Sequence, residues 1–110
     1  MNVSFEEIGR LGVTFAQEGC AAGQVCKVAH SGKVAACAAG EKFCGIVEGV
    51  RGDYAAVMVA GFATVGYSGS LSVGYAELCA DGSGGVKAGT GREYLVVSVD
   101  ETAQTCVIKL

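Results

Sequence analysis

The six cysteines are the residues of this 110-residue chain with the widest range of chemistry: Cys20, Cys26, Cys37, Cys44, Cys79 and Cys106. The opening MNVSFEEIGR has acids where a secretion signal carries bases, so we expect synthesis in a reducing cytoplasm that keeps thiols free. No pair of cysteines has the C-x2-C or C-x4-C spacing of a zinc site. Small apolar core residues are therefore the favoured interpretation, disulfides the second and zinc the last.

His30 is the only histidine, and thus the first candidate for a general base. Nucleophilic catalysis would also need an activated nucleophile and a carboxylate that orients the imidazole. The chain has no G-x-S-x-G motif, and His30 begins the polar segment HSG. A solvated turn histidine is the favoured interpretation.

The glycine-rich segment ADGSGGVKAGTGRE, residues 80–93, has the composition of a phosphate-binding loop. That loop requires G-x-x-x-x-G-K-[ST] followed by a helix, whose N-terminus binds the anion. Here Lys87 follows Val86 rather than glycine, and the segment leads into a strand pattern. We expect a glycine-rich hairpin instead.

The charges exclude several function classes. There are 11 acidic and 8 basic residues, which give a net charge of −3, and neither sign is clustered. Binding to nucleic acid requires a basic patch. A membrane span requires about 18 apolar residues, and an interfacial helix requires a Lys/Arg-rich face. We expect no direct nucleic acid, no membrane, no metal, no cofactor and no catalytic residue.

Short strands separated by glycine, serine and aspartate turns dominate the chain. We expect strands at residues 24–28, 33–37, 43–48, 54–59, 62–67, 75–79, 94–99 and 104–110. With 18 glycines and no proline, this pattern predicts one small all-β domain, a β-barrel or sandwich of short antiparallel strands.

The segment YAAVMV, residues 54–59, is apolar on both faces of the strand that it predicts. Alternation places Val57 on one face and Met58 on the other, which is typical of a strand covered on both sides. Gly61 then predicts a bulge or a sharp bend.

The order of motifs indicates an internal duplication with an offset of 51 residues. In that register residues 9–59 lie over 60–110, and Phe43 lies over Tyr94. Each half has glycine, strand, polar turn, strand, glycine and aromatic strand in the same order. Few residues are identical, so the prediction depends on the pattern.

The same motifs resemble a known family. The order AGQVCKV, KFCGIVEGV, AAVMVAGFATVGYSG, VGYAELCADGSGGVK and REYLVVSVDETAQTCVIKL is similar to that of the small capsid cement, or head decoration, proteins of tailed bacteriophages, over about residues 11–110. The resemblance implies an all-β structural virion protein without enzymatic activity, made in the host bacterial cytoplasm. Such proteins bind the outer capsid surface, often as homotrimers, and bridge major capsid proteins. The six cysteines depart from the family pattern, which puts their role in doubt.

Residues 1–8 are then an N-terminal arm preceding a single β domain at 9–110. In several decoration families such an arm reaches the shell. The candidate residues for contact with the capsid or a sister subunit are Val3, Phe5, Ile8, Leu11, Met58 and Phe62. Two alternatives stay open: the apolar residues of the arm cover one end of the barrel, and Met58 faces the core of its own chain.

A second hypothesis is a small β-barrel that binds a ligand or glycan on a virion or cell surface. Glycan sites stack sugars on exposed aromatic rings. The candidates are Tyr54, Tyr67, Tyr75 and Tyr94.

Overall fold

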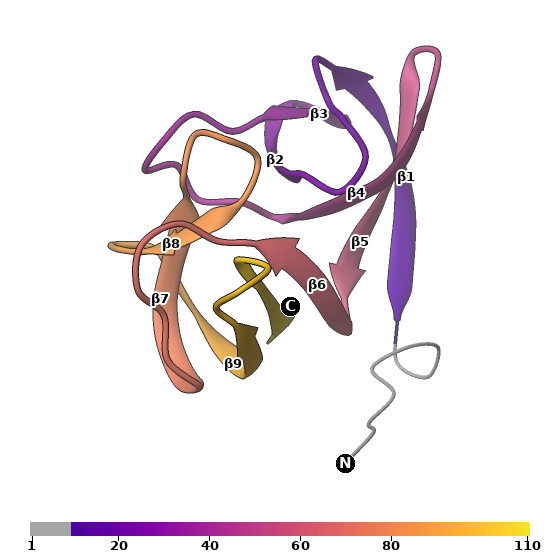
Figure 1. Cartoon of the computed structure of the whole chain (residues 1–110). Helices are drawn as coiled ribbons and strands as arrows, with labels where there is room; N and C mark the ends of the chain where they lie inside the picture. The colour runs from indigo at the N-terminus through magenta and orange to yellow at the C-terminus, as the bar shows by residue number, and fades with distance from the viewer. Residues whose placement is uncertain (1–9) are drawn as a thin grey trace.

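The computed structural model describes residues 10–110, in which ten strands form two sheets and no residue is helical (Figure 1). The prediction of a small all-β domain is confirmed. The strands are β1 (Leu11–Glu18), β2 (Val25–His30), β3 (Lys33–Ala36), β4 (Gly45–Arg51), β5 (Tyr54–Ala60), β6 (Phe62–Gly66), β7 (Gly74–Ala80), β8 (Val86–Ala88), β9 (Arg92–Asp100) and β10 (Thr105–Lys109).

The first five strands close into a barrel in the order β1-β3-β2-β4-β5. Antiparallel pairing of β1 with β5 completes the ring, and the contact of β1 with β3 is parallel. All other pairs of named strands are antiparallel, as predicted. β2 lies between β1 and β3 in the chain and is antiparallel to β3. The chain therefore reverses its direction twice between β1 and β3, so these two strands run parallel.

The remaining five strands form a sheet in the order β6-β10-β9-β7-β8. If the closed barrel is cut between β1 and β3, its strand order becomes β1-β5-β4-β2-β3. Placed over the order of the second sheet, β1 then corresponds to β6, β2 to β7, β3 to β8, β4 to β9 and β5 to β10. An isolated parallel bridge from Tyr67 to Val86 lies at the corresponding gap between the β6 and β8 segments. The two halves share one topology, with strands at 11–60 and 62–109; descent of both halves from one ancestral unit stays a prediction.

Two clusters of buried side chains hold the sheets together. The smaller cluster fills the barrel and contains Cys26, Val34, Val47, Ala55 and Val57. The larger cluster, here called the main core, joins residues of the second sheet to Val25, Phe43, Ile46 and Met58 of the first half. One side of the barrel therefore covers the apolar face of the second sheet, and the two sheets share one hydrophobic core.

This arrangement explains the apolar segment at β5. Val57 points into the barrel and Met58 into the main core, as the alternation predicts. The expectation that the whole strand is covered on both sides was wrong at its N-terminal end, where Tyr54 and Ala56 are exposed. Gly61 has a φ of 104° and forms the bend before β6, as predicted.

The glycine-rich segment is shaped by Asp81. Its carboxylate accepts hydrogen bonds from the backbone N–H groups of Ser83 (2.7 Å) and Gly85 (3.0 Å) and from the Ser68 hydroxyl (2.7 Å). Burial opposes ionisation of this carboxyl, but the three hydrogen bonds lower its pKa below the usual value. The segment forms the β7–β8 hairpin, as the sequence predicted.

Phe43 and Tyr94, equivalent in the 51-residue offset, meet where the two halves join. Their rings stack with centroids 4.8 Å apart and planes 7° from parallel, and the Tyr94 hydroxyl donates to the Phe43 carbonyl at 3.1 Å. The backbone N–H of Val25 also donates to the Gly84 carbonyl across this junction, at 2.9 Å.

Replacement of Tyr94 with phenylalanine keeps the ring stack and removes only the hydroxyl. We expect it to lower the free energy of unfolding by about 1 kcal/mol, because the buried Phe43 carbonyl loses its side-chain donor. Urea unfolding measures the change as a lower midpoint at an unchanged slope. Tyr75→Phe is the control, since the Tyr75 side chain is 74% exposed. Equal midpoints for the two variants would contradict the expectation.

Candidate docking site on the barrel

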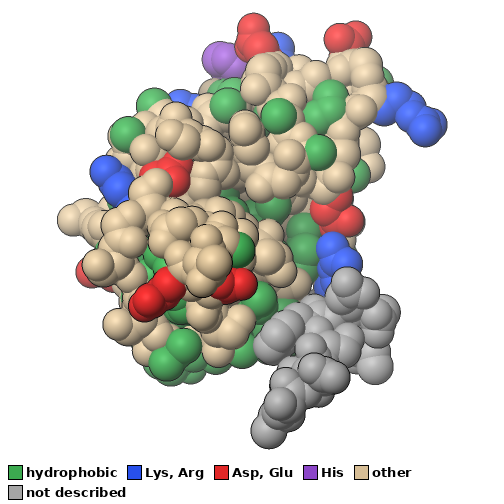
Figure 2. Space-filling view, in the orientation of Figure 1, with side chains coloured by type: hydrophobic (Ala, Val, Ile, Leu, Met, Phe, Trp, Pro, Cys, Tyr) green, Lys and Arg blue, Asp and Glu red, His purple; other side chains and the backbone are tan. Residues whose placement is uncertain are grey.

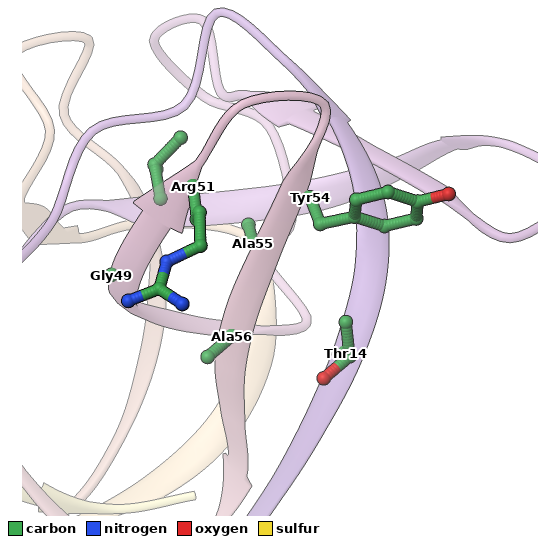
Figure 3. Close-up of a pocket in the computed structure, with 7 residues that line it drawn as sticks. Thr14, Gly49, Arg51, Tyr54, Ala55 and Ala56 are labelled. Carbon is green, nitrogen blue, oxygen red and sulfur yellow. The ribbon is translucent and has the colours of Figure 1, made fainter.

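A hollow of about 470 Å³ lies on the outer surface of the barrel, across β1, β4 and β5 (Figure 3). Its lining residues are Thr14, Gly49, Val50, Arg51, Tyr54, Ala55 and Ala56. Three strands that are adjacent in the sheet, but not all adjacent in sequence, therefore build it.

The floor of the hollow is low because its residues are small. A β-bulge in β4 between Val47 and Gly49 places Gly49 opposite Ala56, and Ala56 is opposite Thr14 on the other side. A Cβ atom added to Gly49 would meet no other atom within 4 Å. A small apolar group could therefore fill this space without displacing the chain.

The β4–β5 hairpin positions the two larger side chains. Its loop is Gly52 and Asp53, and Gly52 has a φ of 59°, which favours glycine. Gln17 of β1 holds this loop: its backbone N–H donates to the Asp53 carbonyl at 2.9 Å and its amide to the Gly52 carbonyl at 2.8 Å. Arg51 and Tyr54 are register partners and so project from the same face of the hairpin.

These side chains give the hollow its chemistry. Tyr54 is 60% exposed and Val50 is 40% exposed. Figure 3 shows the Arg51 guanidinium on the Gly49 side and the Tyr54 ring on the opposite side, over β1. Arg51 forms no ion pair within residues 10–110. An exposed aromatic ring and an arginine without an ion pair in this part of the chain, on two sides of one hollow, are typical of protein–protein contact sites.

The predicted contact residues have different outcomes. Val3, Phe5 and Ile8 lie outside the described residues, as does the whole arm at 1–8. Leu11 is the first residue of β1, pairs with Ala60, and is exposed. It therefore belongs to the sheet, and the first strand begins earlier in the chain than the sequence predicted.

Met58 and Phe62 do not line the hollow. Met58 is 2% exposed and packs in the main core, where its sulfur accepts a hydrogen bond from the Arg10 guanidinium at 3.3 Å. Its assignment as a contact residue was wrong, because the second sheet covers that face of β5. Phe62 is half-buried at the start of β6, opposite Lys109.

The four tyrosines do not form one cluster. Tyr67 and Tyr94 are buried, whereas Tyr54 and Tyr75 are exposed on different sheets. Only Tyr54 lines the hollow. Sequence reasoning missed Thr14, Gly49, Val50 and Arg51; the signal that could have found Arg51 is its place beside the GD turn, opposite the tyrosine.

The groups considered for catalysis are dispersed. His30 is exposed at the end of β2. Within residues 10–110, no three His, Cys, Asp or Glu side chains are placed to hold a metal ion. Lys27 pairs with Glu41 at 2.6 Å and Lys33 with Glu18 at 3.5 Å. Figure 2 shows charged side chains scattered over the visible face without a basic patch.

No segment of residues 10–110 forms a helix long and apolar enough to cross a membrane. Comparison with known protein families and with curated proteins finds no match for this chain.

Proposed function

We propose that this chain is a capsid decoration protein, a structural virion protein that binds the outside of a tailed-phage head. It stabilises the shell by bridging major capsid proteins and has no catalytic role. The order of motifs over residues 11–110 supports the proposal by its resemblance to the cement proteins. The observation that carries it is the exposed hollow beside Tyr54 and Arg51 on a rigid barrel wall.

The mechanism is added interface rather than chemistry. An apolar side chain of the capsid protein enters the hollow, covers the Tyr54 ring and approaches the floor at Gly49. A carboxylate or carbonyl group of the capsid accepts hydrogen bonds from the Arg51 guanidinium, whose donors suit a carboxylate. A protein that binds the assembled shell, but not the free subunits, stabilises the shell by mass action.

The remaining parts of the proposal concern assembly. The chain is made in the bacterial cytoplasm and acts as a homotrimer on the outer capsid surface. Three copies of the hollow bind together, so modest affinity at each becomes high avidity. The arm at 1–8, with Val3, Phe5 and Ile8, supplies a second contact with the shell or a sister subunit. Direct binding to nucleic acid or membrane is not part of this function.

Two substitutions in the hollow test the proposal by cosedimentation with expanded heads that lack the protein. Tyr54→Ala removes the ring, and Gly49→Val fills the floor at a position where an added Cβ atom meets no other atom within 4 Å. We expect each to weaken binding by about 30-fold, the effect of losing a contact worth about 2 kcal/mol. The matched controls are Tyr75→Ala and Thr64→Val, at exposed strand positions of the other sheet.

Controls that bind as the wild type while both hollow variants fail would support the proposed surface. Full binding by Tyr54→Ala and Gly49→Val would remove the hollow from the proposal. No association of the wild-type chain with heads at micromolar concentration would overturn the decoration function itself.

A second candidate function is ligand or glycan binding in the same hollow. Tyr54 offers a ring for stacking, and Thr14 and Arg51 offer hydrogen-bonding groups in the lining of the same hollow. A glycan array separates the two functions: Tyr54-dependent glycan binding without binding to heads favours this candidate.

A further inference from the structure

Four of the six cysteines lie in the barrel half of the chain. Cys20 follows β1, Cys26 is in β2, Cys37 follows β3 and Cys44 immediately precedes β4. The structure places Cys26 and Cys44 side by side. The backbone N–H of Cys44 donates to the Cys26 carbonyl at 2.8 Å, and Cys26 pairs with Gly45 in the β2–β4 ladder.

The two thiols of this pair have different surroundings. Cys26 is fully buried in the barrel core, where its thiol donates a hydrogen bond to the Gly45 carbonyl oxygen at 3.8 Å and interacts with the neighbouring Cys44 thiol. Cys44 is half-buried and packs against the same cluster from its rim. A reagent in solution can therefore reach Cys44 first, because Cys26 has no exposed surface.

The surroundings also change the acidity of the thiols. The hydrogen bond from Cys26, opposed by burial and helped by a backbone hydrogen bond, lowers the pKa of Cys44 to about 7. The same contact and then burial raise the pKa of Cys26. Burial is the first cause of the raised pKa of Cys37 and of Cys106, each about 11, and of the raised pKa of Cys20.

The charged and titratable groups around Cys44 come from several elements. Besides Cys26, its electrostatic neighbours are Cys20, Cys37 and the Tyr94 hydroxyl. Lys27 and Glu41 form an ion pair beside Cys37, so their charges largely offset each other. None of these groups supplies an unpaired positive charge, which leaves the Cys26 thiol as the main stabiliser of a Cys44 thiolate.

We propose that Cys44 is a modification site for low-molecular-weight disulfides, and that Cys26 is the resolving thiol that closes a Cys26–Cys44 disulfide. The site is separate from the hollow and does not depend on the proposed function.

The reaction proceeds by two exchanges. The Cys44 thiolate attacks a disulfide R–S–S–R, forms the mixed disulfide Cys44–S–S–R and releases one thiolate RS⁻. The released thiolate RS⁻ takes the proton of the Cys26 thiol, whose sulfur attacks the Cys44 sulfur. This step forms the Cys26–Cys44 bond and releases the second thiolate. The small disulfide is reduced to two thiols while the two cysteines are oxidised, so electrons balance without another reactant.

The backbone allows the second exchange. A disulfide needs Cα atoms about 4.4–6.8 Å apart, the range found for residues joined across neighbouring strands. The backbone N–H of Cys44 donates to the Cys26 carbonyl at 2.8 Å, so the two residues lie at the spacing of neighbouring strands. Cys44 immediately precedes β4, so the ladder pairs of the barrel do not include it.

Dipyridyl disulfide tests the proposal because each thiol that it releases absorbs light. We expect the folded wild type to release two pyridine thiones per chain in the fast phase and to retain no adduct, with a Cys26–Cys44 peptide link by mass spectrometry. Cys26→Ala should release one thione and keep one adduct on Cys44. Cys44→Ala should lose the fast phase, with a rate at least about ten-fold lower.

The pH profile distinguishes a resolving thiol from a merely structural one. In the wild type the fast phase should be half-maximal near pH 7. It should move upward in Cys26→Ala, since the Cys44 thiolate loses its donor, whereas Cys106→Ala should change neither the profile nor the stoichiometry. Circular dichroism checks that each variant folds, and Cys26→Val, which also lacks a donor, replaces Cys26→Ala if the latter does not.

Three results would overturn the proposal. One is labelling spread evenly over the six cysteines of the folded wild type. Another is a wild-type product that keeps the adduct on Cys44 without a link to Cys26. The last is an unchanged pH profile in a folded Cys26 variant.

Discussion

Replacement of Leu78 with alanine is expected to lower the free energy of unfolding by about 2–5 kcal/mol. Leu78 has no exposed surface and lies in the main core. Its strand, β7, pairs with β8 on one side and β9 on the other, at Ala88 and Arg92. Because both neighbours hold the backbone in place, the surrounding atoms cannot close the space that the lost side chain leaves.

Chemical denaturation of the purified chain measures this change. The matched control is Leu11→Ala, since Leu11 is also a leucine in a strand but is 55% exposed. We expect that control to change the free energy of unfolding by no more than about 0.5 kcal/mol. A loss of the same size in both variants would show that Leu78 does not occupy the core position described above.

Replacement of Gly45 with alanine is expected to destabilise the fold by about 1–3 kcal/mol or more. A Cβ atom at Gly45 would collide with the Met58 carbonyl oxygen and would lie 2.8 Å from Cγ1 of Val57. Both obstacles belong to β5, which is held between β1 and β4 in the closed barrel. Relief of the collision would require β4 and β5 to separate at the pair of Ile46 with Met58.

Gly49→Ala is the control for this substitution, in the same strand. A Cβ atom at Gly49 has no neighbour within 4 Å. Alanine there also reduces the entropy of the unfolded chain, which stabilises a protein by about 0.4–1 kcal/mol where the backbone is compatible. Thermal melts of the two variants should therefore move in opposite directions or differ by several degrees. A melt of Gly45→Ala that coincides with that of Gly49→Ala would contradict the close approach of β4 and β5.

The local sequence was enough to predict most strands. β5 and β9 are rich in valine and aromatic residues, and the turns between strands contain glycine, serine or aspartate, so local preferences agree with the fold. β1 and β8 were missed for two reasons. β1, LGVTFAQE, has exposed and half-buried side chains only, and β8 has three residues inside a glycine-rich hairpin. The strand conformation of β1 depends on hydrogen bonds to β5, which is distant in sequence, whereas β8 pairs locally with β7 but is too short to show a strand pattern.

Composition and periodicity thus determined the class of this protein: an all-β chain with short strands, glycine turns and no clustered charge. Only the tertiary structure decided how each face of a strand is used. Met58 and Tyr54 lie on the same face of β5, yet one is in the main core and the other lines the hollow, because the second sheet covers only one end of that face. Cys26 and Cys44, 18 positions apart, are neighbours because β2 and β4 pair. The burial and the contacts of a side chain depend on which strands pair. The local residue pattern predicts that a segment is a strand, but not which distant strand is its partner.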